Sequence, residues 1–267
     1  MAKDIHVLLV EDDPYARDLM ALLLTRDWRT HVVGEAEGQH SLLEFLDHYP
    51  HPIDVVVLDT EVPGSPQLPF ILAETLRGRQ KKPAILYTAT RPDAIVMERL
   101  VQTGFGGYVL KSEILYALGS AVAQVAMGHC VLSPGTAPLA SRYIQCDGSL
   151  VIDGREAVQG FTPRESELIR LGIIFNLSIR DMADELVLSP EWVSELVSKV
   201  YKKLGLREML NGEVPMENYF DDPAVLERCR KITRRTGKQK PGKELRKGPW
   251  MATLAFHLLT APKIREY

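Results

Sequence analysis

The chain has 267 residues, of which 45% are hydrophobic and 25% charged, and its formal net charge at pH 7 is −3. This composition is typical of a folded globular protein and excludes a disordered chain or a coiled-coil rod. No apolar run reaches the roughly 18 residues that a membrane-spanning helix needs. Three widely spaced cysteines argue against a disulfide framework or a metal cluster, and favour a reducing cytoplasm.

The charge is distributed unevenly along the chain. Residues 1–125 contain 11 basic and 17 acidic side chains, and residues 161–207 contain 7 of each. Residues 228–247 contain ten Lys or Arg and a single acid, Glu244. This asymmetry indicates either an anionic partner for the carboxyl-terminal part or a solvated basic tail.

Residues 1–125 alternate between short apolar runs and amphipathic segments. The predicted strands are Ile5–Val10, Val32–Val33, Val55–Leu58, Ala84–Tyr87 and Tyr108–Leu110. The predicted helices lie around Tyr15–Leu23, Leu42–Leu46, Ala94–Val101 and Ile114–Ala126. Apolar runs of this kind are typical of strands buried on both faces of a parallel sheet. The pattern predicts an α/β fold with a five-stranded, doubly wound parallel sheet, and a ligand site at the carboxyl ends of its strands.

The pattern changes after residue 127. Residues 128–160 are rich in Gly and predict a linker, with a small hairpin around Cys146-Asp147-Gly148. Residues 161–207 have a helical period and open with the capping sequence Thr162-Pro163-Arg164-Glu165. Residues 208–267 form a basic extension with a predicted helix over 223–235 and a last apolar segment, Trp250–Leu259. The sequence therefore predicts domains at 1–127 and 161–207, joined by a linker and followed by this extension.

Polar side chains follow the predicted strands at the edge where parallel strands end. They are Glu11, Asp12, Asp13, Asp59, Thr88 and Lys111. Carboxylates that face one another cannot all remain ionised and unpaired, and a hard divalent cation such as Mg²⁺ resolves the conflict. A lysine and a hydroxyl add donors for anionic oxygens. The cluster therefore predicts a site for transferring a phosphoryl group onto a carboxylate.

Residues 4–127 resemble the receiver domain of bacterial response regulators. The resemblance rests on Val10-Glu11-Asp12-Asp13-Pro14, Val57–Gly64, Tyr87-Thr88-Ala89 and Gly107–Lys111. It implies that Asp59 is the phospho-acceptor and that Mg²⁺ is held by Asp59, by Asp12 with Glu11 nearby, and by the backbone carbonyl of Glu61. It also implies that Lys111 contacts the phosphoryl group and that Thr88 and Tyr108 couple phosphorylation to a conformational shift.

Each of these residues also has a purely structural interpretation. Asp12 and Asp13 could cap the first helix, and Lys111 could pair with Asp59 without any phosphoryl chemistry. Degenerate receivers, however, typically lack one of the functional groups, and none is missing here. The resemblance further implies a histidine kinase, or a small acyl phosphate, as the phosphoryl donor.

Residues 161–206 resemble a LuxR-type helix-turn-helix, as in the NarL/FixJ class. The matching residues include Phe161–Glu165, Leu177-Ser178, Met182-Ala183, Leu188-Ser189 and Lys202–Gly205. The segment before the turn carries one residue more than the family pattern, and Asn176 stands near the usual Gly. The resemblance implies that the helix 190–203 is the recognition helix lying in the major groove of DNA.

The expected recognition helix departs from the family pattern. Glu191 and Glu195 place negative charge where DNA phosphates would lie, and Trp192 stands where the family has a small residue. The remaining candidate DNA contacts are Arg180, Ser194, Ser198, Lys199, Lys202 and Lys203. Basic residues at 228–247 could restore phosphate contacts. The dimerising helix of the class is not recognisable, because Asn211-Gly212 and Pro215 interrupt it.

The sequence thus predicts a cytoplasmic two-component response regulator rather than an enzyme. Phosphorylation of Asp59 in the presence of Mg²⁺ controls a DNA-binding output and hence transcription. Its implied partners are a histidine kinase, DNA and a second copy of the chain, and no membrane. Two alternatives remain: an output that binds a protein with little or no DNA binding, and a regulator that works independently of phosphorylation.

Overall fold

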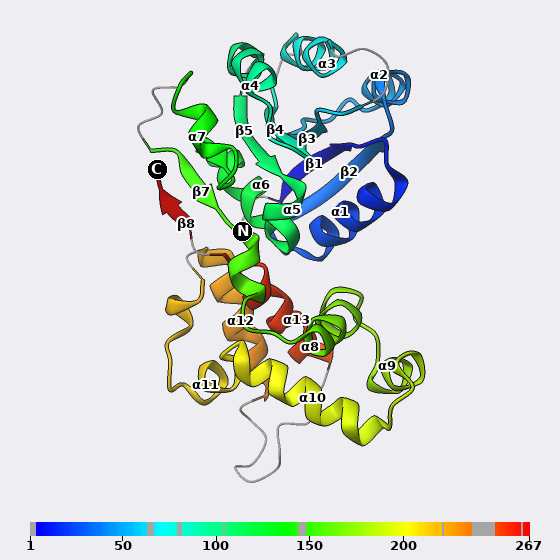
Figure 1. Ribbon diagram of the computed structural model, residues 1–267, viewed down its shortest axis with the longest axis vertical. Coiled ribbons are helices and arrows are strands. Elements are labelled where there is room, and N and C mark those ends of the chain that lie inside the picture. Colours follow the sequence, from blue (N-terminus) through cyan, green and yellow to red (C-terminus); the bar gives the residue numbers. More distant parts are fainter. Residues whose placement is uncertain are drawn as a thin grey trace. The chain divides into compact units, whose positions relative to one another are not determined.

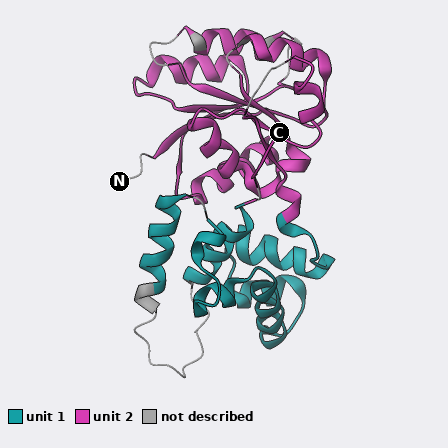
Figure 2. Ribbon diagram, turned by 90° about the vertical axis from the view of Figure 1, so that its left-hand side faces the viewer, with its two compact units in different colours: residues 1, 157–261 teal, residues 2–156, 262–267 magenta. Residues whose placement is uncertain are grey.

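A computed structural model describes residues 4–62, 67–78, 82–103, 105–143, 148–220, 222–236, 249–262 and 264–267. The chain divides into two compact units (Figures 1 and 2). The first, here called the α/β unit, contains residues 2–156 and 262–267, and the second, the helical unit, contains residues 157–261. Within the described ranges, no helix is both long and apolar enough to span a bilayer.

The α/β unit is built on an eight-stranded sheet with the order β2-β1-β3-β4-β5-β6-β7-β8. The strands are β1 (Ile5–Val10), β2 (Thr30–Ala36), β3 (Val55–Asp59), β4 (Ala84–Ala89), β5 (Phe105–Leu110), β6 (Val131–Leu132), β7 (Leu150–Ile152) and β8 (Ile264–Glu266). Neighbouring strands from β2 to β7 are parallel, and β8 is antiparallel to β7. The α/β class and the five predicted strands are confirmed.

The predicted number of strands is wrong, because the sheet continues past β5. Its three added strands are only two or three residues long. Strands this short have no readable alternation of apolar and polar residues, so sequence periodicity does not detect them.

Two of these short strands, β6 and β7, lie within residues 128–160, where a linker was predicted. The hairpin expected there falls partly on residues 144–147, outside the described part of the chain. The described partners of β7 are β6 and β8.

Helices cover both faces of the sheet. They are α1 (Pro14–Arg26), α2 (Gln39–His48), α3 (Leu68–Arg77), α4 (Ala94–Leu100), α5 (Lys111–Ile114), α6 (Leu118–Ala126) and α7 (Ala137–Ala140). One apolar core lies under α2, α3, α4 and α7, and the other lies under α1 and α6. The single helix expected over 114–126 is interrupted at Leu115, whose φ of 42° breaks the helical path. Sequence periodicity did not identify α3.

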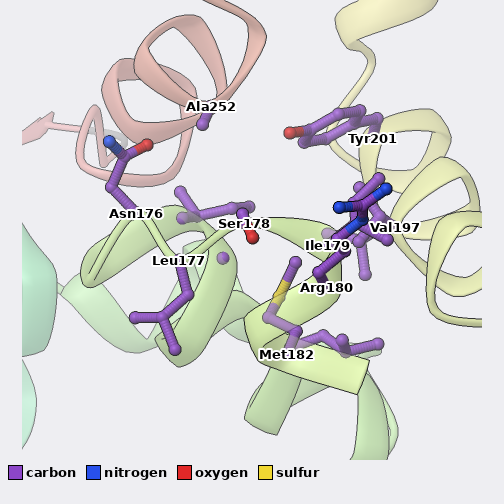
Figure 3. Close-up of a pocket in the computed structure, with 13 residues that line it drawn as sticks. Asn176, Leu177, Ser178, Ile179, Arg180, Met182, Val197, Tyr201 and Ala252 are labelled. Carbon is purple, nitrogen blue, oxygen red and sulfur yellow. The ribbon is translucent and has the colours of Figure 1, made fainter. Parts of the chain in front are cut away.

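The helical unit contains α8 (Pro163–Leu168), a π-helical turn (Ile169–Ile174), α9 (Ile179–Leu186), α10 (Pro190–Lys203), α11 (Leu206–Asn211), α12 (Pro223–Thr236) and α13 (Pro249–Leu259). Buried apolar residues of α8, α9 and α10 form its core. The predicted helix at 223–235 is confirmed as α12, and the apolar segment Trp250–Leu259 lies in α13. The π-helical turn, α9, α10 and α13 also surround a pocket (Figure 3).

Candidate functional site

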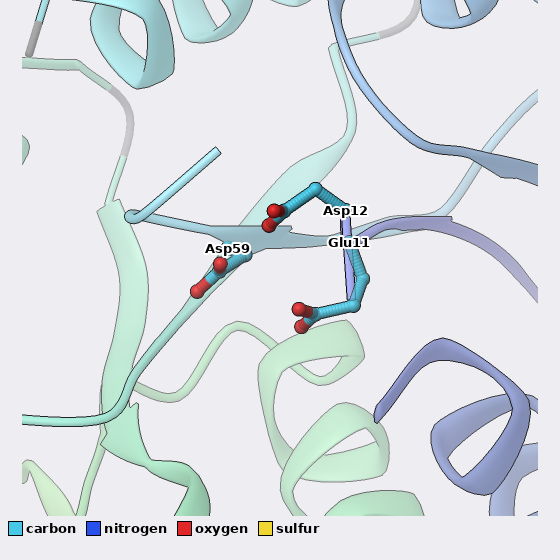
Figure 4. A group of neighbouring side chains, drawn as sticks. All are labelled: Glu11, Asp12 and Asp59. Atoms are coloured by element: carbon cyan, nitrogen blue, oxygen red, sulfur yellow. The ribbon is translucent and has the colours of Figure 1, made fainter. Parts of the chain in front are cut away.

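Three carboxylates converge at the carboxyl edge of the sheet. Glu11 and Asp12 directly follow β1, and Asp59 is the last residue of β3, the strand paired with β1. Figure 4 shows the three side chains facing a common space, and one oxygen of each lies within 4.8 Å of the others. Glu11 and Asp59 are each only 1% exposed. The topology therefore brings together residues that are far apart in the sequence, as predicted.

Lys111 places a positive charge in this cluster. It lies at the start of α5, directly after β5, and its Nζ donates a hydrogen bond to Glu11 Oε1 at 2.9 Å. The same Nζ lies 2.8 Å from Glu11 Oε2 and 3.3 Å from Asp59 Oδ1. Neither of these two oxygens receives a well-directed hydrogen bond from the described residues. The contact with Asp59 is therefore an ion pair.

Burial dominates the electrostatics of the site. It raises the pKa of Asp59 to about 6, the negative charge of Glu11 adds to the rise, and Lys111 opposes it. Burial also raises the pKa of Glu11 above its usual value. Burial alone would lower the pKa of Lys111, but its contacts with Glu11 and Asp59 outweigh this effect and raise it. The carboxylates thus lie where their negative charge is poorly stabilised by the protein itself.

The donor chemistry of the site fits a hard divalent cation. Glu11, Asp12 and Asp59 offer only oxygen ligands, as Mg²⁺ prefers. With all four groups ionised, the three carboxylates and Lys111 leave two uncompensated negative charges. Asp59 Oδ1 and Glu11 Oε2 are buried acceptors that receive no well-directed hydrogen bond from the described residues. A cation would satisfy both the charge and these oxygens.

Thr88 and Tyr108 lie beside the acidic cluster. Thr88 on β4 pairs in register with Asp59, and its buried Oγ1 has no hydrogen-bond partner in the described structure. The Tyr108 side chain is fully buried, and its hydroxyl donates to the backbone oxygen of Arg91 at 3.2 Å. Burial raises the pKa of Tyr108 to about 12. The Thr88 hydroxyl is therefore free to bond a new group. The hydrogen bond to Arg91 holds the Tyr108 side chain in the interior.

Glu61 turns its carboxylate away from this cluster. Its side chain is exposed and accepts from the Thr90 hydroxyl at 2.6 and 2.8 Å, one distance to each oxygen. Its backbone hydrogen bond to Asp59 lowers the pKa of Asp59 and offsets part of the rise caused by burial. The Glu61 side chain therefore has a separate partner, Thr90, which the sequence did not reveal as part of the site.

Residues 7–123 match the response regulator receiver domain family. These residues therefore form a response regulator receiver domain. It is 24% identical over 208 residues to the Fimbriae Z protein of Salmonella typhimurium, covering 78% of this chain and 94% of that protein. It is 26% identical over 209 residues to the probable transcriptional regulatory protein NarL of Mycobacterium tuberculosis, covering 76% and 89%. Both alignments are longer than the receiver match.

Solved structures of response regulators also resemble the chain. The RcsB response regulator of Salmonella typhimurium is 20% identical, with a TM-score of 0.46, and the alignment covers 77% of this chain and 93% of that one.

Buried hydrogen bonds connect this receiver's β5 to the segment between β6 and α7. The Thr136 hydroxyl donates to the backbone oxygen of Tyr108 at 2.5 Å, and Ser133 Oγ accepts from the Leu110 amide at 3.0 Å. Glu113, two residues past Lys111, accepts from the Gly135 amide at 2.7 Å. This segment was predicted to be a linker, and its contacts with β5 were not predicted. A Ser-Pro-Gly-Thr turn directly after two apolar residues is the signal that could have indicated them.

The helical unit begins with the capped helix that the sequence predicted at Thr162. Thr162 and Ser178 begin α8 and α9 with reciprocal capping boxes, and Ser189 caps α10. The extra residue before the turn is accommodated by the π-helical turn, and Asn176 adopts a φ of 60°. Val187, between α9 and α10, also has a left-handed conformation with φ of 53°.

The candidate DNA contacts on α10 are mostly engaged within the protein. Lys199 pairs with Glu195 at 3.0 Å and lies over the Trp192 ring. Lys203 pairs with the buried Glu165 at 2.7 Å, and this contact lowers the pKa of Glu165.

The remaining candidates on and near α10 differ in exposure and partners. Ser198 donates to the backbone oxygen of the half-buried Ser194 at 2.9 Å. Lys202 and Arg180 are exposed. Lys202 and Arg180 are therefore the better placed of the basic candidates to meet a phosphate. The basic residues at 237–248 lie outside the described part of the chain.

The segment after α10 also differs from expectation. A six-residue helix, α11, is present where no dimerising helix was recognisable in the sequence. It ends at Gly212, whose φ of 74° gives the left-handed cap that glycine permits. The interrupting Asn211-Gly212 pair therefore ends a helix rather than preventing one.

Proposed function

We propose that this response regulator accepts a phosphoryl group on Asp59 and that phosphorylation controls DNA binding by the helical unit, and hence transcription. The observation that carries the proposal is the arrangement of Asp59 beside Lys111 and the unpartnered Thr88 hydroxyl. A structural ion pair alone does not explain a buried hydroxyl left without a partner next to the acceptor. The phosphoryl donor is a phosphohistidine of a partner kinase, and the protein acts in the cytoplasm as a homodimer.

The transfer is a substitution at phosphorus. A carboxylate oxygen of Asp59 attacks the phosphorus, an O–P bond forms and the P–N bond to the donor histidine breaks. The imidazole leaves with the bonding electron pair and takes a proton from solvent. With a pKa of about 6, Asp59 is mostly the nucleophilic carboxylate at neutral pH.

The surrounding residues stabilise the transferred group. Lys111 Nζ, already 3.3 Å from Asp59, neutralises part of the phosphoryl charge. Glu11, Asp12 and Asp59 would hold Mg²⁺, which when bound supplies positive charge to the phosphoryl oxygens. The Thr88 hydroxyl turns to donate to one phosphoryl oxygen. Phosphorylation adds about −1.5 to −2 charges and three acceptor oxygens, which is sufficient to bias such a local switch.

Tyr108 connects this event to the rest of the receiver. When Thr88 moves toward the phosphoryl group, the tyrosine ring fills the space it leaves and gives up its bond to the Arg91 carbonyl. The backbone of Tyr108 is also bonded by Thr136, so movement of β5 reaches the segment before β7. This is the route by which we propose that phosphorylation alters the output.

Acetyl phosphate labelling in Mg²⁺ tests the acceptor. Intact-mass measurement should show one added phosphoryl group on the wild type and none on Asp59→Asn. Asp18→Asn, a matched change at an exposed acid on α1, should label like the wild type. Absence of label on the wild type, or equal label on Asp59→Asn, would overturn the assignment.

The DNA-binding output is supported by the helix-turn-helix pattern of α9 and α10 and by the exposed Arg180 and Lys202. One relative is described as a probable transcriptional regulatory protein. The affinity for a mixture of promoter fragments should fall steeply with salt, because Lys and Arg release counterions from DNA phosphates.

A protein-binding output is the second candidate, and the surface of α10 favours it. Glu191 and Glu195 are exposed, Trp192 is 49% exposed, and two of the lysines are paired within the unit. Such a surface is less basic than a DNA-binding helix requires. Failure to bind promoter fragments at 50 mM salt, with phosphorylation intact, would select this candidate.

A further inference from the structure

The pocket of the helical unit takes no part in the phosphoryl transfer proposed above. It has a volume of about 410 Å³ and is lined by residues of α8, the π-helical turn, α9, α10 and α13 (Figure 3). Small-molecule sites usually measure about 300–1,000 Å³. The pocket therefore falls within the size range of small-molecule sites.

Specific backbone features hold this pocket open. The π-helical turn inserts an extra residue at one wall, and such turns are frequent at functional sites. Gly172 lies on that wall, where a Cβ would come within 2.8 Å of Met182 Sδ. Asn176, which has a left-handed backbone conformation, is also part of the pocket lining. The pocket thus follows from the extra residue by which this segment departs from its family pattern.

The lining combines apolar walls with hydrogen-bond donors. The apolar residues are Leu168, Ile173, Leu177, Ile179, Met182, Val197, Val200 and Ala252. Polar donors come from Asn176, Arg180 and Tyr201, and none of the lining residues is an Asp or Glu. An anionic acceptor is therefore favoured over a cation, because Arg180 is the only charged side chain in the lining.

Tyr201 supplies a donor that the described structure does not use. Figure 3 shows its hydroxyl directed into the space between α10 and Ala252. No hydrogen bond to this hydroxyl is formed within the described ranges. Burial raises the pKa of Tyr201 to about 12, so the phenol keeps its proton at neutral pH. The Ser178 hydroxyl, by contrast, already accepts from the Asp181 amide.

We infer that this pocket binds a small apolar carboxylate, whose hydrocarbon part contacts the apolar walls and whose carboxylate accepts from Arg180 and Tyr201. The ligand would touch α9 and α10 together and so stabilise their mutual arrangement. If the proposed DNA-binding function holds, occupancy also withdraws Arg180 from DNA phosphate. The binding itself requires neither DNA nor phosphorylation.

Isothermal titration of the full chain with decanoate, below its micelle concentration, tests this inference. Decanoate should bind saturably with one site per chain, and decyltrimethylammonium, with the same chain length and opposite charge, at least tenfold more weakly. Arg180→Gln and Tyr201→Phe should each weaken decanoate about tenfold, because a hydrogen bond to a charged group is lost. Ala252→Phe should weaken it further by filling the pocket. Arg207→Gln, an exposed change on α11 outside the lining, should leave binding unchanged.

Other results would overturn the inference. Absence of saturable decanoate binding, or equal binding of the two surfactants, would show that the pocket does not select an anion. If Arg180→Gln and Tyr201→Phe both bind decanoate as tightly as the wild type, the ligand lies elsewhere. This test does not require Ala252→Phe to fold. Because no DNA is present, these results are independent of the outcome of the promoter experiment.

Discussion

Replacing Asp59 by Asn should stabilise the metal-free protein at alkaline pH. The acceptor carboxylate is 1% exposed, and its pKa is raised from 3.8 to about 6, chiefly by burial. The folded state binds the proton of Asp59 more tightly than the unfolded state does. Protonation of this carboxyl therefore stabilises the folded protein, and this contribution is largest below about pH 4. That contribution is lost as the pH rises toward 6 and remains absent above it.

The magnitude follows from the size of the shift. A rise of about two pKa units corresponds to roughly 3 kcal/mol, and the attraction of Lys111 is already included in it. Asn removes the ionisation while keeping nearly the same shape. At pH 8 the free energy of unfolding should therefore rise by about 2–3 kcal/mol, and at pH 4 it should change little.

Urea denaturation at pH 4 and pH 8 in chelator-treated buffer measures both values. Asp18→Asn serves as the control, because Asp18 is exposed and should show no difference of this size between the two pH values. A variant that is no more stable than the wild type at pH 8, or that gains equally at both pH values, would refute the argument that burial of a charged acceptor destabilises the receiver.

Three further changes test other parts of the fold. Val187→Gly should raise the free energy of unfolding by about 1 kcal/mol in chemical denaturation, because Val187 is 89% exposed and a β-branched residue is strained at its φ of 53°. Gly154→Ala should lower the melting temperature and the free energy of unfolding by about 1–3 kcal/mol, since the added Cβ would clash with the backbone oxygen of Ile114. Lys203→Gln should destabilise the helical unit by breaking a partly buried ion pair, whereas Lys202→Gln should leave thermal stability unchanged and weaken only DNA binding in a fluorescence anisotropy titration.

The residues of the receiver site could be predicted because residues that follow parallel strands lie close together, however far apart they are in the sequence. Glu11, Asp59 and Lys111 each directly follow a predicted strand, and parallel strands end at one edge. Their residue types then indicate the chemistry. The sequence does not reveal the hydrogen-bond partners of these groups. Examples are the lack of a partner for the Thr88 hydroxyl among the described residues and the pairing of Glu61 with Thr90.

The parts that escaped prediction depend on contacts between distant segments. β6, β7 and β8 are too short to show a period, and β8 pairs with a strand more than a hundred residues earlier in the chain. Sequence periodicity did not identify α3, whose second residue is Pro69. Lys203 was expected to contact DNA, and only the fold reveals its pairing with Glu165.

The pairing of β8 with β7 makes the helical unit an insertion in the α/β unit. The chain leaves the α/β unit after residue 156 and returns to it at residue 262. The Tyr267 amide then donates to the Ser149 oxygen at 2.8 Å, and Arg265 pairs with Glu156. For a flexible chain, closing a loop of this length costs on the order of 4 kcal/mol. The edge of β7 therefore stays open until β8 pairs with it, and deleting residues 264–266 would expose that edge for pairing with another chain.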